Sequence, residues 1–163
     1  MTFALPTDGI VAATGHRRIE APWRLLRAFA IVEMSRRRPR KAISGMALGW
    51  DTAWALAALD LGVPLIAAIP FPEQDSRWGW RDKSTYRFLL ARAESAHVCN
   101  PRYARDAFQW RNVWMVNNSY RSVAMWDGRT SGGTWNYLTY AKSQRHEITY
   151  SWDRWLAFTG RIR

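Results

Sequence analysis

Residues 41–69 read KAISGMALGWDTAWALAALDLGVPLIAAI, and this stretch decides the fold. Lys41 to Met46 is a short apolar run, and the Ala-rich stretch from Thr52 to Leu61 has the composition of a helix. Gly62 stands where a helix C-terminal cap is expected, and Pro64 to Ile69 is a second apolar run. That second run does not alternate with polar residues, which is typical of a parallel strand covered on both faces. The stretch therefore predicts a strand, a helix and a parallel strand in succession.

The same alternation of short apolar runs with longer amphipathic stretches continues on both sides of this unit. We expect one Rossmann-like α/β domain over residues 1–163, with a mostly parallel sheet of five to six strands and helices on both faces. A longer loop is expected at Pro70–Trp80, and the tail from Trp152 is expected to pack through Trp155 and Phe158. The other expected strands are Gly9–Ala13, Ala96–Asn100, Ser122–Trp126 and His146–Ser151, and the other expected helices are Pro22–Arg36, Lys83–Glu94, Asp106–Asn118 and Thr134–Gln144.

The composition narrows the class of protein. Of the 163 residues, 48% are hydrophobic and 23% are charged, which excludes a disordered or collagen-like chain. Cys99 is the single cysteine, so no internal disulfide forms, and no Cys/His metal set is found. The longest apolar run, Leu61 to Pro72, is far below the roughly 20 residues of a membrane span. We expect a cytoplasmic protein without signal peptide, metal, cofactor or membrane partner.

Charge and tryptophan content are unusual. The chain has 24 basic against 13 acidic residues, a net charge of +11, and 11 Trp. Of the basic residues, 21 are arginine. Two interpretations stay open: a compositional bias of the genome, or a basic surface that attracts an anion.

Three glycine-containing turns follow expected strands: Thr14 to Arg17, Ser44 to Asp51, and Asp127 to Thr134. In an open parallel sheet, ligands bind beyond the carboxyl ends of the strands. Glycine lets the backbone approach a ligand closely, and a helix that begins directly afterwards offers unpaired N–H groups to an anion. The turns together predict a phosphate site. The candidate ligand-binding residues are Gly15, His16, Arg17, Ser44, Gly45, Gly49, Asp51, Arg111, Asn112, Asp127, Gly128, Gly132, Gly133 and Thr134.

Several of these residues have an ordinary structural interpretation as well. Arg17 is expected to pair with a phosphate or carboxylate, whereas Asp51 accepts from a ribose hydroxyl or only caps a helix. Trp50, Trp78 and Trp80 are candidates for stacking on a base, and the alternative is that they cover the edge of the core.

The turns resemble those of the SLOG superfamily, the Rossmann-like group that unites DprA/Smf DNA-processing proteins with LOG phosphoribohydrolases. Within it, the chain is most similar to the stand-alone YpsA-like branch. The resemblance implies a nucleotide pocket at the strand ends, with the Gly-Gly-Thr turn taking a phosphate, and a homo-oligomer as the form to test. The likeness rests on Thr14–Arg17, Ser44–Asp51, Arg111-Asn112, Trp126-Asp127-Gly128 and Gly132-Gly133-Thr134.

The resemblance does not imply a reaction. LOG enzymes carry a Glu in the motif Pro-Gly-Gly-x-Gly-Thr-x-x-Glu, and nucleoside deoxyribosyltransferases, a similar group, also have a Glu near this position. Here Asn136 and Tyr137 stand there instead. Without that carboxylate, glycosidic chemistry loses its main agent. We therefore lean towards a protein that is not an enzyme.

Three functional hypotheses follow. The first is non-catalytic binding, for sensing or sequestration, of a phosphorylated nucleotide derivative such as an ADP-ribose-like or cyclic nucleotide signal. SLOG domains of Thoeris-type antiphage effectors recognise such signals, so the resemblance suggests a role in antiphage defence. The second is cleavage or transfer at an N-glycosidic bond, with Asp51 or Glu73 as the acid. The third is DprA-like binding of single-stranded nucleic acid, which the spread of arginines along the chain disfavours.

Overall fold

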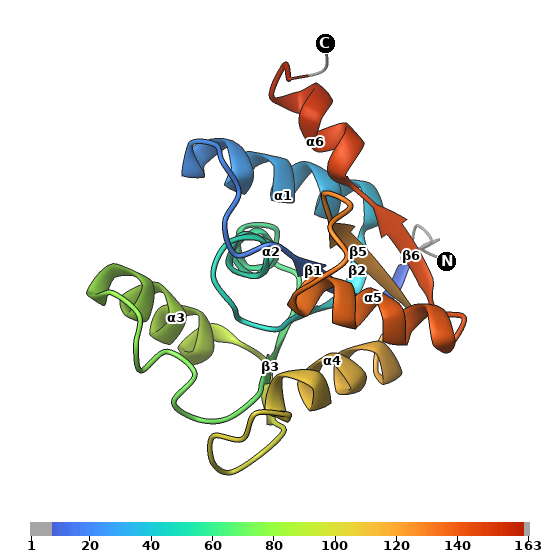
Figure 1. Cartoon of the computed structure of the whole chain (residues 1–163). Coiled ribbons are helices and arrows are strands. Elements are labelled where there is room, and N and C mark those ends of the chain that lie inside the picture. The colour runs from blue at the N-terminus through green and yellow to red at the C-terminus, as the bar shows by residue number, and fades with distance from the viewer. Residues whose placement is uncertain (1–7, 162–163) are drawn as a thin grey trace, which may run out of the picture.

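A computed structural model describes residues 8–161, in which six strands and six helices alternate along the chain (Figure 1). All strands are parallel, and their order in the sheet is β4-β3-β2-β1-β5-β6. The two ends of the domain expected over residues 1–163 lie outside the described residues. The bounds are β1 Asp8–Gly15, α1 Trp23–Arg37, β2 Pro39–Ser44, α2 Trp50–Asp60, β3 Leu65–Ile69, α3 Trp80–Arg92, β4 Ser95–Val98, α4 Ala107–Asn117, β5 Arg121–Met125, α5 Gly133–Ser143, β6 Glu147–Tyr150 and α6 Trp152–Phe158.

The sheet is covered on both faces, as the unalternating apolar strands predict. Figure 1 shows α4 and α5 on one face and the other four helices on the opposite face. The larger apolar cluster joins the sheet to α1, α2, α3 and α6 and contains the fully buried Trp50, Trp54 and Trp155. The smaller cluster joins the sheet to α4 and α5 through residues such as Met115 and Tyr137. The high tryptophan content is thus partly a property of the core.

The connections diverge at the centre of the sheet. Strand β1 lies between β2, whose neighbours follow in order to one edge, and β5, which is followed by β6 at the other edge. The carboxyl ends of β1 and β5 lie side by side, because Gly15 pairs with Met125. This is the topological switch point, where doubly wound sheets bind their ligands.

The expected fold class is therefore confirmed, and the differences are at element boundaries. Helix α2 begins at Trp50 and not at Thr52, so Trp50 and Asp51 belong to its first turn and not to the preceding turn. Helix α3 likewise begins at Trp80, three residues before the expected start at Lys83. The C-terminal segment packs as expected. Trp155 is buried, and Phe158 contacts it and Phe29 on α1.

No helix within residues 8–161 combines the length and the apolar character that crossing a membrane requires. The same range contains no group of three or more His, Cys, Asp or Glu side chains arranged to hold a metal ion.

Candidate functional site

A cavity of about 500 Å³ opens where β1 and β5 end, with α4 and α5 forming much of its wall. Its volume lies in the range of small-molecule sites, about 300–1,000 Å³. Most of the candidate residues named from the sequence line it: Gly15, His16, Arg17, Asp51, Arg111, Asn112, Gly132, Gly133 and Thr134. The remaining candidates do not line it: Ser44, Gly45, Gly49, Asp127 and Gly128. Of these, Gly49 lines a second cavity.

The N-terminus of α5 opens directly onto the cavity. Gly132 precedes the helix with φ 92° and ψ −179°, a conformation that favours glycine, and no side chain caps the first turn. A Cβ atom added at Gly132 or Gly133 would meet nothing within 4 Å, so the space in front of this helix end is empty. The first N–H groups of a helix have no intrahelical partner. This end of α5 therefore offers donors and a positive dipole end to an anion.

Arg111 forms the floor of the cavity from α4. Its side chain is buried, and Nη1 donates to the carbonyl oxygen of Gly45 at 3.0 Å and to Oε1 of Gln74 at 3.2 Å. The Nε atom is buried and has no hydrogen-bond partner among the described residues. Burial lowers the pKa of Arg111, but an arginine keeps its charge in proteins. The cavity therefore has a fixed positive charge beneath it.

Asp51, in the first turn of α2, is the buried carboxylate of the cavity. Oδ2 accepts a hydrogen bond from the backbone N–H of Ala47 at 3.4 Å, whereas Oδ1 has no partner among the described residues. Burial raises the pKa of Asp51 to about 6, although the positive charge of Arg111 acts in the opposite direction. The side chain thus contacts the preceding turn, as a cap would, and leaves one oxygen unpaired beside the cavity.

His16 and Asp127 join the first and third turns to each other. The Nε2 atom of His16 lies 2.9 Å from Oδ1 of Asp127 and accepts from the backbone N–H of Asp127 at 3.0 Å. Burial lowers the pKa of His16, which favours the neutral ring that can accept at Nε2. Asp127 also pairs with Arg129. These contacts give His16 and Asp127 a role in holding the turns together.

The glycines of the first two turns are required by packing. A Cβ atom on Gly15 would lie 2.6 Å from the ring of Trp50, and one on Gly45 would lie 2.8 Å from Oδ2 of Asp51. Gly49 has φ 78°, and its Cβ atom would lie 2.5 Å from the backbone carbonyl oxygens of His16 and Arg17. The sequence suggested that these glycines let a ligand approach. The structure shows that other parts of the protein approach them instead.

The expected stacking tryptophans do not line the cavity. Trp50 is fully buried between Phe29 and Trp54, because α2 begins at this residue and turns the indole into the core. That prediction is wrong for Trp50. Trp78 is partly buried against Tyr86, and Trp80 is 75% exposed beside Arg81 on α3.

Phe108 lines the cavity, as the aromatic residue Tyr137 also does, and the sequence did not single it out. The guanidinium carbons of Arg17 and Arg111 each lie 5.7 Å from the centre of its ring. The ring of Phe108 on α4 thus lies near two cations, Arg111 from the same helix and Arg17 from the loop after β1. The signal in the sequence is the spacing of Phe108 and Arg111, which places them one helical turn apart on the same face.

Gln74 is the second residue that sequence reasoning missed. It lies in the loop after β3, is buried, and donates from Nε2 to the carbonyl oxygen of Met46 at 3.0 Å while accepting from Arg111. The loop that was expected at residues 70–80 therefore reaches the site and orients Arg111. Glu73, the alternative acid named from the sequence, is exposed and does not line the cavity.

Comparison with known proteins gives one relative and several similar folds. No protein-family model matches the chain. The uncharacterized SPbeta prophage-derived protein YoqJ of Bacillus subtilis strain 168 is 32% identical over 132 residues, with 69% of this chain and 77% of that protein covered.

The similar solved structures include two DNA processing proteins A. DprA from Streptococcus pneumoniae has a TM-score of 0.66 at 17% identity, with 88% of this chain covered, and this chain spans 53% of its length. DprA from Helicobacter pylori, whose structure is described as giving insight into its single-stranded DNA binding mode, has a TM-score of 0.66 at 16% identity, covering 96% of this chain and 75% of that one. TM1055 has a TM-score of 0.57 at 14% identity, covering 86% and 72%. At these identities the likeness shows the fold alone.

Proposed function

This chain belongs to the YoqJ family and has the fold of DprA and TM1055, and from that premise we propose that it binds a phosphorylated nucleotide derivative without turning it over. The ligand occupies the cavity at the carboxyl ends of β1 and β5, with its phosphate at the N-terminus of α5. An ADP-ribose-like or cyclic nucleotide signal is the ligand class we favour.

One observation carries the proposal. The first turn of α5 faces a cavity of about 500 Å³ with no side-chain cap and with empty space over Gly132 and Gly133. A capped or covered helix end would have its donors satisfied by the protein, whereas this one leaves them for a ligand. The unpaired Oδ1 of Asp51 and Nε of Arg111 independently indicate that polar groups of the site lack a partner.

The charges of the lining support an anionic ligand. Arg17, Arg105, Arg111 and Arg129 line the cavity, and Asp51 and Asp106 are the acidic residues of the lining. Arg111 is buried, where its charge is poorly screened and acts strongly on an anion in the cavity.

The acidic residues support binding over catalysis. The position of the LOG glutamate is occupied by Asn136 and Tyr137, which line the cavity but carry no carboxylate. Asp51 contacts the backbone of Ala47 and lies against Arg111, an arrangement that holds a helix start in place.

A second candidate function is binding of single-stranded nucleic acid. The DprA folds and the combination of Phe108 with arginines favour it, because such sites pair phosphates with cations and stack bases on aromatic rings. The salt dependence of the affinity distinguishes the two candidate functions. The affinity for a nucleic-acid strand is expected to fall on the order of 10³-fold between 50 and 200 mM salt when several phosphates are contacted, whereas the affinity for one small nucleotide is expected to change much less.

The test is a calorimetric titration of the purified protein with mono-, di- and cyclic nucleotides and with ADP-ribose. Mass spectrometry identifies any molecule that the protein releases on denaturation. Gly133→Ala puts a methyl group in front of the helix end and is expected to weaken binding at least about tenfold, the loss of about 1.4 kcal/mol. Gly79→Ala is the control, since Gly79 stands at the start of another helix, α3, has open space around it and lies outside the cavity. Failure of every member of the panel to bind overturns the proposal.

A further inference from the structure

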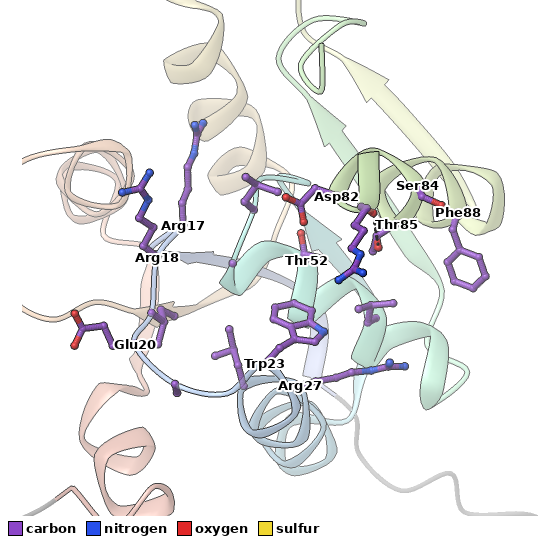
Figure 2. A pocket seen from close by; sticks show the side chains of 17 residues that line it. Arg17, Arg18, Glu20, Trp23, Arg27, Thr52, Asp82, Ser84, Thr85 and Phe88 are labelled. Carbon is purple, nitrogen blue, oxygen red and sulfur yellow. Dashed lines mark hydrogen bonds between the residues drawn. The ribbon is translucent and has the colours of Figure 1, made fainter. Parts of the chain in front are cut away.

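A second and larger cavity, of about 840 Å³, adjoins the first. Its walls are the loop between β1 and α1, the start of α1, the exposed side of α2 and the first turns of α3 (Figure 2). The proposed phosphate site does not use this space. A protein that bound only a mononucleotide would have no need of it.

The two cavities meet at Arg17, which lines both of them. Figure 2 shows Arg17 extending from the loop away from α1, and its guanidinium lies 5.7 Å from the ring of Phe108 in the first cavity. The turn after β2 separates the cavities further along, with Ala47 lining the first and Leu48 the second. A phosphate bound beside Arg17 would therefore lie between the two cavities.

The second cavity has the chemistry of a nucleotide site. Trp23 lines the cavity and is 44% exposed, and Figure 2 shows its indole below Thr52. An exposed indole offers a flat face on which a base can stack. Arg18 and Arg81 line the same space, and within residues 8–161 neither forms a salt bridge. Asp82, exposed on α3, offers a carboxylate acceptor at the far wall. Glu20 is a second carboxylate of the lining. The aromatic surface, the cations and these acceptors are complementary to a base, a phosphate and an exocyclic amine.

We propose that the ligand is a dinucleotide unit, with one nucleotide in the cavity at α5, the second stacked on Trp23, and the connecting phosphate at Arg17. This inference rests on the proposed function and extends it from one nucleotide to two. The unit is either a free dinucleotide or two successive nucleotides of a strand, which share this chemistry.

The test compares riboadenylates of one, two and twelve nucleotides, each with a 5′-phosphate, on wild-type protein and on Trp23→Ala. Wild-type protein is expected to bind the dinucleotide more tightly than the mononucleotide. Trp23→Ala removes the stacking surface and is expected to weaken dinucleotide binding by about 5- to 150-fold, the range for base stacking on an aromatic ring, while mononucleotide binding stays unchanged. Trp110→Ala is the matched control, because Trp110 is 45% exposed, as Trp23 is 44% exposed, and lies outside both cavities.

The outcomes separate this inference from the function on which it rests. If no riboadenylate binds, both fail. If the mononucleotide binds and the dinucleotide binds no more tightly, or if Trp23→Ala weakens both equally, the dinucleotide inference is overturned and the phosphate site stands. A dodecamer that binds far more tightly than the dinucleotide, with a steep dependence on salt, identifies a strand as the source of the unit. Equal affinity for the two identifies a free dinucleotide.

Discussion

Arg111 on α4 donates a hydrogen bond to the carbonyl oxygen of Gly45, 66 residues earlier in the chain, at 3.0 Å. The same guanidinium group lies over the Cα atom of Gly45, where an added Cβ atom would be 3.2 Å from Nε of Arg111 and 2.8 Å from Oδ2 of Asp51. Helix α4 is thereby fixed against the turn after β2. Helix α4 can approach this turn so closely only because Gly45 has no side chain.

Gly45→Ala is therefore expected to destabilise the protein by about 1–3 kcal/mol, the cost of forcing an extra methyl group into a well-packed site. Chemical denaturation measures the loss. Gly133→Ala serves as control, because its Cβ atom has open space and alanine is the better helix residue by roughly 0.5–1 kcal/mol. Equal unfolding free energies for Gly45→Ala and wild type would contradict the close packing of Asp51 and Arg111 over this glycine.

Asp51 is expected to make binding pH-dependent. Its pKa is raised to about 6 by burial, so the side chain is charged at pH 7.5 and neutral at pH 5. As the pH falls through about 6, the cavity loses a negative charge, and an anionic ligand binds more tightly. The linked effect on stability has the same sign. The contribution of Asp51 to the free energy of unfolding is full below its ordinary pKa of 3.8 and is lost as the pH rises through about 6.

Asp51→Asn isolates this effect from other titrations. The groups that face Asp51 are Arg111, Arg17 and Tyr137, and burial raises the pKa of Tyr137 well away from this range. His16, whose pKa is lowered by burial, and the ligand phosphate titrate equally in both proteins. The ratio of the two affinities is expected to be largest above pH 7 and to approach one below pH 5. A ratio that is constant from pH 5 to pH 8 would show that Asp51 is not the titrating group.

Much of the fold was predictable because the sequence repeats one local pattern. The strand Leu65–Ile69 has no polar alternation and follows an Ala-rich helix. This pattern predicts a parallel sheet that is covered by helices on both faces. The side chain directions were less predictable. Trp50 follows a glycine turn, and the sequence alone did not show that α2 begins at this residue and buries the indole at 0% exposure. A shift of two residues in a helix start changes which face a side chain occupies.

The same limit applies to the site. The Gly132-Gly133-Thr134 turn was found because its signal is local, and Arg111 because of the family resemblance. The hydrogen bond from Arg111 to Gln74 joins residues that are 37 positions apart in the sequence, and periodicity carries no information about such a contact. Phe108 was not predicted for a different reason, because a single aromatic residue on an amphipathic helix is ordinarily a core residue.

The C-terminal helix is expected to depend on one ion pair, in which the carboxylate is buried and the arginine is partly exposed. Glu33 on α1 is fully buried and accepts hydrogen bonds from Arg154 at both oxygens and from Ser151 at 3.0 Å. Arg154→Met leaves a buried carboxylate without its cation and is expected to cost about 3 kcal/mol in unfolding free energy. The double variant Glu33→Gln with Arg154→Met removes the charge as well and is expected to recover part of the loss. A double variant less stable than the single one would contradict the pairing.

Phe108 is expected to supply the stacking surface that the sequence assigned to Trp50, Trp78 and Trp80. Its ring lines the cavity at α5, so Phe108→Leu, which keeps apolar volume against Phe71 but removes the aromatic face, is expected to weaken binding of adenosine 5′-monophosphate by about 5- to 150-fold. Inorganic phosphate has no base, and its affinity is expected to stay unchanged. Calorimetry with both probes measures the difference. A variant that loses affinity for phosphate and nucleotide alike would place Phe108 among the residues that shape the cavity, and an unaffected nucleotide affinity would remove it from the site.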